Sequence, residues 1–138
     1  MTHPTSTSAQ AGATELAQRT PEQIFAHHAQ ALGAEDLDAI VMDYAEDACI
    51  LTASGVLRGK AAIRDFFAKA LEQLPQARWD VQPIFADDIL FLRWTADSSR
   101  NSVPDGVDTF VFRGGLIHAQ TVHFSLVPKT EQSSKEVV

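Results

Sequence analysis

In the first half of the chain, apolar side chains recur every three to four residues, which is the period of amphipathic helices. A hydroxyl residue, a proline and then a glutamine form a capping box, so the sequence predicts a first helix after Thr20 that ends at Gly33. A short second helix follows, and a third covers about residues 60–74, where Pro75 stops it. The predicted buried faces carry Ile24, Phe25, His28, Ala31 and Leu32, then Leu37, Ile40, Val41 and Tyr44, then Ile63, Phe66, Phe67, Ala70, Leu71 and Leu74.

After Pro75 the period changes from helical to the alternation of strands. Strands are predicted at residues 78–85, 89–97, 107–112 and 116–127, with turns at Asp87-Asp88, at 104–106 and at 113–115. Between the second and third helices, residues 48–52 and 56–59 are predicted to form a small hairpin. Helices followed by a run of antiparallel strands are typical of an α+β domain whose helices cover one face of a curved sheet.

The length of 138 residues suits one domain. Residues 1–19 and 128–138 are polar and poor in large apolar groups, so we predict two tails around a folded body at 20–127. A net charge of −7 makes nucleic acid and anionic membranes unfavourable partners, and no apolar run reaches the roughly 20 residues that span a bilayer. Without a secretory signal pattern, and with Cys49 as the only cysteine, we expect a cytoplasmic protein that has no internal disulfide.

Several stretches of the chain resemble the nuclear transport factor 2-like superfamily, in particular its SnoaL-like and ketosteroid-isomerase-like members. They are TPE at 20–22, AEDLDAI at 34–40, YAEDA at 44–48, LRGKAAIRDFF at 57–67, GVDTF at 106–110 and GLI at 115–117. The resemblance implies a cone-shaped curved antiparallel sheet wrapped around the N-terminal helices, a deep apolar pocket between them, and homodimers through the outer sheet face. This fold hosts isomerases, cyclases, dehydratases, epoxide hydrolases and non-enzymatic binders, so function has to be argued from the site.

The resemblance places Asp108 where ketosteroid isomerases hold a protonated aspartic acid that donates a hydrogen bond to the developing enolate. Asp108 is predicted in a strand among Val107, Phe110 and Phe112, where burial would raise its pKa and favour the neutral acid. The alternative is an exposed aspartate beside a turn at 104–106.

Two other catalytic positions depart from the isomerase pattern. His28 falls where those enzymes place a tyrosine donor, and it can donate a hydrogen bond, accept a proton, or simply be a satisfied core residue. Thr52 falls at the general base, where we expect it to line the pocket and bind the ligand, but its hydroxyl cannot take a proton near neutral pH. The enzyme hypothesis therefore pairs Asp108 as the acid or hydrogen-bond donor with His28 as its partner donor or base.

Strand alternation points two further sets of side chains inward, one that includes Trp94 and one that includes Gln120, and the resemblance directs both sets into the pocket. Trp94 and Gln120 would orient a ligand through an indole N–H and an amide, although Trp94 is equally suited to core packing. Phe110, Phe124 and Tyr44 would complete the pocket wall, or Tyr44 would cap the core. We assign two groups of residues outside the pocket. Thr121 and His123 point to the outer face of the sheet, where they could join a dimer surface. The acids Asp43, Glu46, Asp47, Asp87 and Asp88 are predicted to be solvated.

We expect no metal, because His27 and His28 are adjacent, about 100° apart on a helix, and no His-x-x-x-His pair occurs. No cofactor is expected, since neither a P-loop nor a dinucleotide fingerprint is present. The sequence thus predicts a SnoaL-like pocket for a small hydrophobic oxygenated molecule. The protein would then act as a cofactor-independent isomerase, lyase or hydratase. The alternative is a non-enzymatic ligand-binding or interaction dimer whose pocket is vestigial and filled by Trp94, Phe110 and Phe124.

Overall fold

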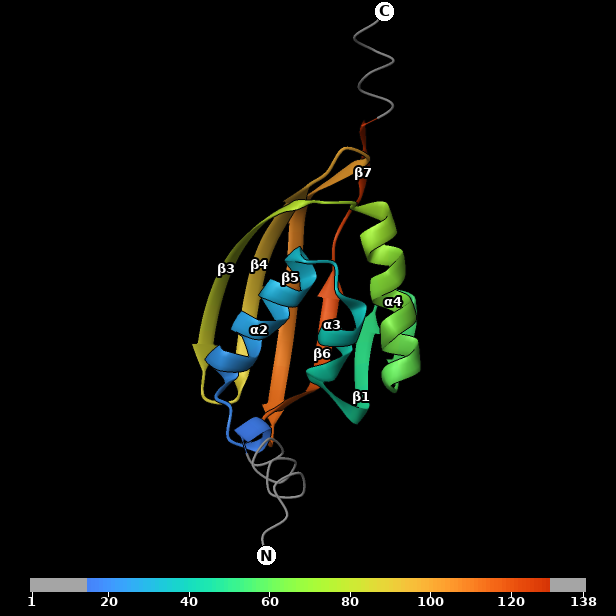
Figure 1. Ribbon diagram of the computed structural model, residues 1–138. Coiled ribbons are helices and arrows are strands. Elements are labelled where there is room, and N and C mark those ends of the chain that lie inside the picture. The colour runs from blue at the N-terminus through green and yellow to red at the C-terminus, as the bar shows by residue number, and fades with distance from the viewer. Residues whose placement is uncertain (1–14, 130–138) are drawn as a thin grey trace, which may run out of the picture.

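A computed structural model describes residues 15–129 as helices on one side of a curved sheet (Figure 1). In chain order the elements are α2 (Pro21–Gly33), α3 (Leu37–Met42), β1 (Tyr44–Thr52), β2 (Gly55–Arg58), α4 (Lys60–Gln73), β3 (Arg78–Ala86), β4 (Ile89–Asp97), β5 (Asn101–Arg113), β6 (Leu116–His123) and β7 (Val127–Pro128). Of the predicted tails, residues 1–14 and 130–138 lie outside the described residues. Within 15–129, no helix combines the length and apolar character that a membrane crossing requires.

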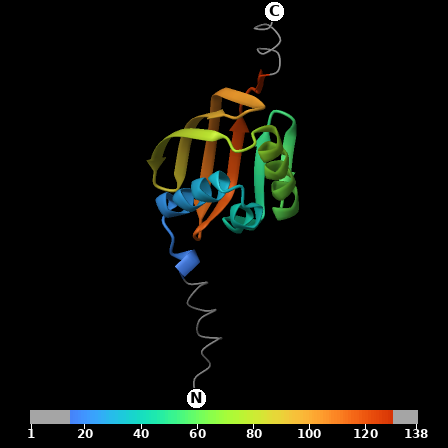
Figure 2. The ribbon, with the colours of Figure 1, turned by 45° about the horizontal axis from the view of Figure 1, so that its top comes forward.

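The sheet has the strand order β2-β1-β6-β5-β4-β3, and β7 adds to the end of β5. Strand β1 pairs with β6 in parallel, and the other pairs are antiparallel, so the sheet is mixed. Figures 1 and 2 show that α2, α3 and α4 lie on the same face, with α2 in front of β3 to β5 and α4 beside β1. The predicted fold class, an α+β cone, is confirmed, with one parallel pair that the sequence pattern did not indicate.

Local signals set the helix ends. The Thr20 hydroxyl accepts from the backbone N–H of Gln23, while the Gln23 side chain accepts from the backbone N–H of Thr20, which completes the predicted capping box. The carboxylate of Asp36 caps α3 through the N–H of Ala39. Both caps use residues three apart in sequence, and of the two the capping box at Thr20 was predicted.

Three predicted boundaries were wrong. No turn forms at residues 104–106, because β5 runs unbroken from Asn101 to Arg113. Gly106 is needed there for a different reason: a Cβ atom at this position would lie 2.2 Å from the indole ring of Trp94. Tyr44 does not extend the second helix; it begins β1, where its side chain is fully buried. The last long strand ends at His123, and residues 127–128 form the separate β7.

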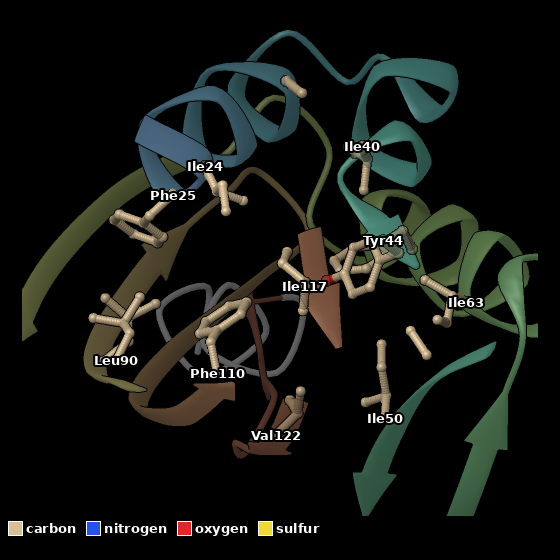
Figure 3. Close-up of a cluster of buried hydrophobic side chains, with 14 of the residues drawn as sticks. Ile24, Phe25, Ile40, Tyr44, Ile50, Ile63, Leu90, Phe110, Ile117 and Val122 are labelled. Carbon is tan, nitrogen blue, oxygen red and sulfur yellow. The ribbon is translucent and has the colours of Figure 1, made fainter. Parts of the chain in front are cut away.

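The hydrophobic core fills the space between the helices and the inner face of the sheet. Figure 3 shows Ile24 and Phe25 projecting from α2 toward Leu90 and Phe110 of the sheet. On the other side of the core, Ile40, Tyr44, Ile50 and Ile63 gather where α3 and α4 meet β1. Each fully buried Leu, Ile or Phe side chain stabilises the fold by about 1.5–3 kcal/mol.

Asp43 was predicted to be a solvated helix-end acid, and the structure corrects this. Its carboxylate is fully buried, with one oxygen 2.8 Å from Nη1 of Arg19 and the other 2.7 Å from Nδ1 of His27. Arg19 also donates to the carbonyl of Gly115 in the β5–β6 turn. Arg19 lies in the segment predicted to be a tail, and this ion pair fixes that segment against the sheet. The other four predicted solvated acids are exposed.

Candidate functional site

An apolar cavity of about 80 Å³ lies between α2, α4 and the inner face of β3 to β6. Six of the residues predicted for the pocket line it: His28, Trp94, Asp108, Phe110, Gln120 and Phe124. The other lining residues are Phe25, Ala29, Leu32, Phe66, Phe67, Ala70, Leu74, Trp79, Val81, Leu92 and Val122. Pockets that enclose drug-sized ligands have volumes of about 300–1,000 Å³, so this cavity admits only a few waters or a small apolar group.

Sheet register brings the polar lining residues together. Asp108 of β5 lies opposite Leu92 of β4 and opposite Val122 of β6. Two residues further along β5, Phe110 faces Gln120 across the strand pair. Because opposite residues of paired strands point to the same face, the alternation of three neighbouring strands places one carboxylate in an apolar wall.

Both carboxylate oxygens of Asp108 accept a hydrogen bond from an uncharged N–H group. The indole nitrogen of Trp94 lies 2.9 Å from Oδ1, and Nε2 of Gln120 lies 3.0 Å from Oδ2. Burial raises the pKa of Asp108 to about 6, while the bonds from Trp94 and Gln120 act in the opposite direction. The sequence-based expectation of a neutral acid therefore changes: at pH 7 the carboxylate form predominates.

A third hydrogen bond continues this network away from the cavity: the hydroxyl of Tyr44 donates to Oε1 of Gln120. An ionised Asp108 can only accept hydrogen bonds, so the Gln120 amide must present its N–H to Asp108. Its oxygen then faces Tyr44, which must be the donor. Burial, together with the negative charges of Asp108 and Asp43, raises the pKa of Tyr44 well above its usual range. Tyr44 is thus a permanent donor behind Gln120 and does not line the cavity.

His28 is buried among aromatic rings. The ring centroids of Phe67 and Phe110 both lie 5.6 Å from that of His28, and Tyr44 lies at 5.9 Å. Burial lowers the pKa of His28 to about 4, against an opposing effect of Asp43, so the imidazole is neutral at pH 7. Its Nδ1 is buried and has no hydrogen-bond partner within residues 15–129, which is costly for a polar atom.

The structure places Thr52 outside the cavity. Its hydroxyl accepts from the N–H of Ser54 at 3.1 Å and donates to the carbonyl of Gly55 at 3.3 Å, so it closes the β1–β2 turn. Thr52 lines a separate outer groove. The position at which the resemblance expects a general base thus carries a turn residue here.

Sequence reasoning missed four aromatic residues of the wall as site residues. Phe25, Phe66 and Phe67 were assigned to the buried faces of helices, and Trp79 of β3 was not considered. Trp79 pairs with Ala96 of β4, and its ring centroid lies 5.6 Å from that of Trp94. The alternation of β3 with β4 was the signal that could have placed Trp79 beside Trp94. Within residues 15–129, no group of three His, Cys, Asp or Glu side chains is arranged to hold a metal ion.

Helices that close an apolar cavity against one face of a curved mixed sheet define a class of small pocket proteins. The chain belongs to the SnoaL-like domain family, whose profile matches residues 25–120. That span contains every residue of the hydrogen-bond network around Asp108.

Solved structures with the same fold agree with this assignment. A SnoaL-like protein of unknown function from Burkholderia thailandensis is 21% identical, with a TM-score of 0.63 over 75% of this chain and 93% of that one. The epoxide hydrolase/cyclase-like enzyme SalBIII, which has a role in pyran ring formation in salinomycin, is 23% identical, with a TM-score of 0.65 over 76% and 90%. An NTF2-like protein from Cytophaga hutchinsonii is 15% identical, with a TM-score of 0.65 over 78% and 92%. No curated protein matches the chain.

Proposed function

We propose that the cavity binds a small apolar molecule that carries an oxygen atom, and that Asp108 transfers a proton on it without a cofactor. One observation carries this proposal. Of the residues that line the cavity, Asp108 is the only acid, it is held by two neutral donors, and burial raises its pKa to about 6. A general base works best when its pKa lies near the working pH.

In this proposal Asp108 acts first as the base. Each carboxylate oxygen has two acceptor sites and uses one of them within the protein, so a lone pair remains for a substrate proton. A C–H bond next to a carbonyl breaks, its electron pair moves onto the carbonyl oxygen, and the proton stays on Asp108. Return of that proton at another carbon completes an isomerisation, and loss of a leaving group completes a lyase step.

His28 takes the role of a neutral hydrogen-bond partner in place of the predicted base. A group whose pKa is lowered to about 4 is a weak proton acceptor at pH 7. Its unpartnered Nδ1 can instead carry the N–H that binds the substrate oxygen as negative charge develops there. A buried donor that is already in place needs no reorganisation during the reaction.

The structural likeness to SalBIII supports this class of chemistry, because an epoxide hydrolase/cyclase-like enzyme acts on an oxygenated organic compound. The proposed reaction types are therefore an isomerase, a lyase or a hydratase. A homodimer through the outer sheet face belongs to the same proposal, since Ile84, Ile89 and Phe91 expose 41–59% of their surface on that face.

The small cavity volume favours a second candidate, a ligand-binding protein without catalysis. Trp94, Phe110 and Phe124 take up part of the space between helices and sheet, as expected for a vestigial pocket. In that case the protein would hold a small ligand, or would act mainly through its dimer surface.

Deuterium incorporation from D₂O into butanone and cyclopentanone, followed by NMR, separates the two candidates. We expect exchange that accelerates as the pH rises through about 6, as Asp108 ionises. Asp108→Asn should slow it by about 10²-fold or more. The matched control is Asp80→Asn, an exposed strand aspartate. Binding of these ketones without exchange would support the second candidate, and full exchange in Asp108→Asn would contradict the catalytic role of Asp108.

A further inference from the structure

A second hollow lies directly outside the cavity. This outer groove has a volume of about 570 Å³ and runs between the first half of α4, the β1–β2 turn and the end of β6. Phe66, Val122 and Phe124 line both the groove and the cavity. These three side chains are therefore the wall between the two compartments.

The two compartments differ in chemistry. Inside, apolar and aromatic side chains surround the polar groups of Asp108, Gln120, Trp94 and His28. The outer groove carries polar side chains along its length, namely Thr52, Ser54, Asp65, Lys69 and His123. Neither Lys69 nor Asp65 forms an ion pair within residues 15–129, so both remain free to bind a polar ligand group.

The three side chains of the wall differ in how deeply they are buried. Val122 is buried on β6, opposite Asp108, and belongs to the core. Phe66 and Phe124 are only half-buried, and Phe124 lies just after the last residue of β6. Phe66 lies within α4, but a half-buried side chain changes rotamer at lower cost than one packed in the core, whether or not it lies in a helix. Phe66 and Phe124 are thus the part of the wall that a ligand can displace.

The volumes of the cavity and the groove indicate that a larger ligand must displace these side chains. A cavity of about 80 Å³ cannot enclose a ligand larger than a small group, whereas a groove of about 570 Å³ has room for a chain of several atoms. A molecule whose reactive end reaches Asp108 must therefore be very small or must extend outward past Phe66 and Phe124.

We propose that the ligand is an elongated amphipathic molecule: its apolar, carbonyl-bearing end enters the cavity, its hydrogen-bonding end lies in the outer groove, and Phe66 and Phe124 form the gate. This inference rests on the proposed function for the inner end and adds the outer binding site and the gate. The groove then selects among carbonyl compounds that all fit the cavity, so Ser54, Lys69 and His123 determine specificity without touching the reacting atoms.

Two probes test this arrangement by ligand-observed NMR. Butanone carries only the methyl ketone end that is proposed to enter the cavity, and a hydroxy ketone with the same end has a hydroxyl several carbons away that can reach the groove. Ala62→Trp fills the groove from α4 and should weaken binding of the hydroxy ketone at least about tenfold while leaving butanone unchanged. Ala61→Trp, at the neighbouring exposed position that does not line the groove, is the matched control and should change neither.

A second variant tests the gate. Phe124→Ala removes half of it outside any strand or helix, so the fold should be kept, and the hydroxy ketone should bind at least as tightly and associate faster. Unchanged hydroxy ketone binding in Ala62→Trp, or equal loss of both probes, would overturn the two-compartment inference and leave the proposed function intact. Failure of wild-type protein to bind butanone would overturn the proposed function, and this inference with it.

Discussion

Asp43 and Asp108 are both buried carboxylates, and their neighbours give them opposite roles. Asp43 contacts the guanidinium of Arg19 and the ring of His27, so its charge is balanced by a cation from the N-terminal segment. Within residues 15–129, the hydrogen-bond donors to the Asp108 carboxylate are the neutral N–H groups of Trp94 and Gln120. A buried charge without a counter-ion is unfavourable, so burial raises the pKa of Asp108.

The comparison teaches how to separate a structural acid from a reactive one. Asp43 joins α3, the N-terminal segment and the β5–β6 turn, and it is not among the residues that line the cavity. Asp108 lines the cavity, as does His28, whose Nδ1 has no hydrogen-bond partner within residues 15–129. Burial alone does not distinguish the two carboxylates, whereas the charge of their partners and the presence of open space do.

The largest expected effect comes from breaking the structural pair. Arg19→Met leaves the buried charge of Asp43 without its guanidinium and should lower the free energy of unfolding by about 3 kcal/mol. Urea unfolding at pH 7, followed by circular dichroism, measures this. Arg64→Met, which breaks the exposed pair with Asp38, is the control and should cost less than about 1 kcal/mol. Equal losses of unfolding free energy in the two variants would contradict the structural role of Asp43.

The next effect tests the uncompensated charge of Asp108. Its pKa is near 3.8 in the unfolded chain and about 6 when folded, so its contribution to stability is complete below pH 3.8 and is lost as the pH rises through 6. The stability of Asp108→Asn relative to wild type should therefore rise by about 2–3 kcal/mol from pH 4 to pH 8. Urea unfolding at both pH values measures it, and a pH-independent difference would contradict the assignment.

The smallest expected effect on stability is at His28. His28→Phe removes a ring nitrogen that has no partner within residues 15–129 and keeps an aromatic ring among Phe25, Phe67 and Phe110, so stability should change by less than about 1 kcal/mol. Ketone exchange should fall about tenfold or more, because the substrate oxygen loses its donor. A large loss of stability with unchanged exchange would instead make His28 a core residue.

The fold was predictable where its signals are local. The capping box at Thr20 and the alternation through β4 act over two to four residues, and both are visible in the sequence. The role of Gly106 was not visible, because it is required by the ring of Trp94 from a neighbouring strand and not by a turn. The burial of Asp43 likewise depends on Arg19, which is 24 positions away in the chain.

For the candidate site, the sequence predicted well which residues face inward, but it predicted their protonation states less well. Alternation placed Trp94 and Gln120 on the cavity side, and the family resemblance placed Asp108 there. The state of Asp108 depends on how burial balances against two hydrogen bonds, and that balance needs coordinates. Thr52 lies outside the cavity because the β1–β2 turn uses its hydroxyl, a contact that no alternation pattern indicates.

The most direct test of the central claim is an NMR titration of the side-chain carboxyl carbon of Asp108 in the ¹³C-labelled protein, with Asp108→Asn used to assign the signal. The account predicts a midpoint at about pH 6, because the carboxylate is buried with neutral donors only. A midpoint at or below 3.8, the value expected without burial, would contradict it and leave Asp108 without a reason to act as a base.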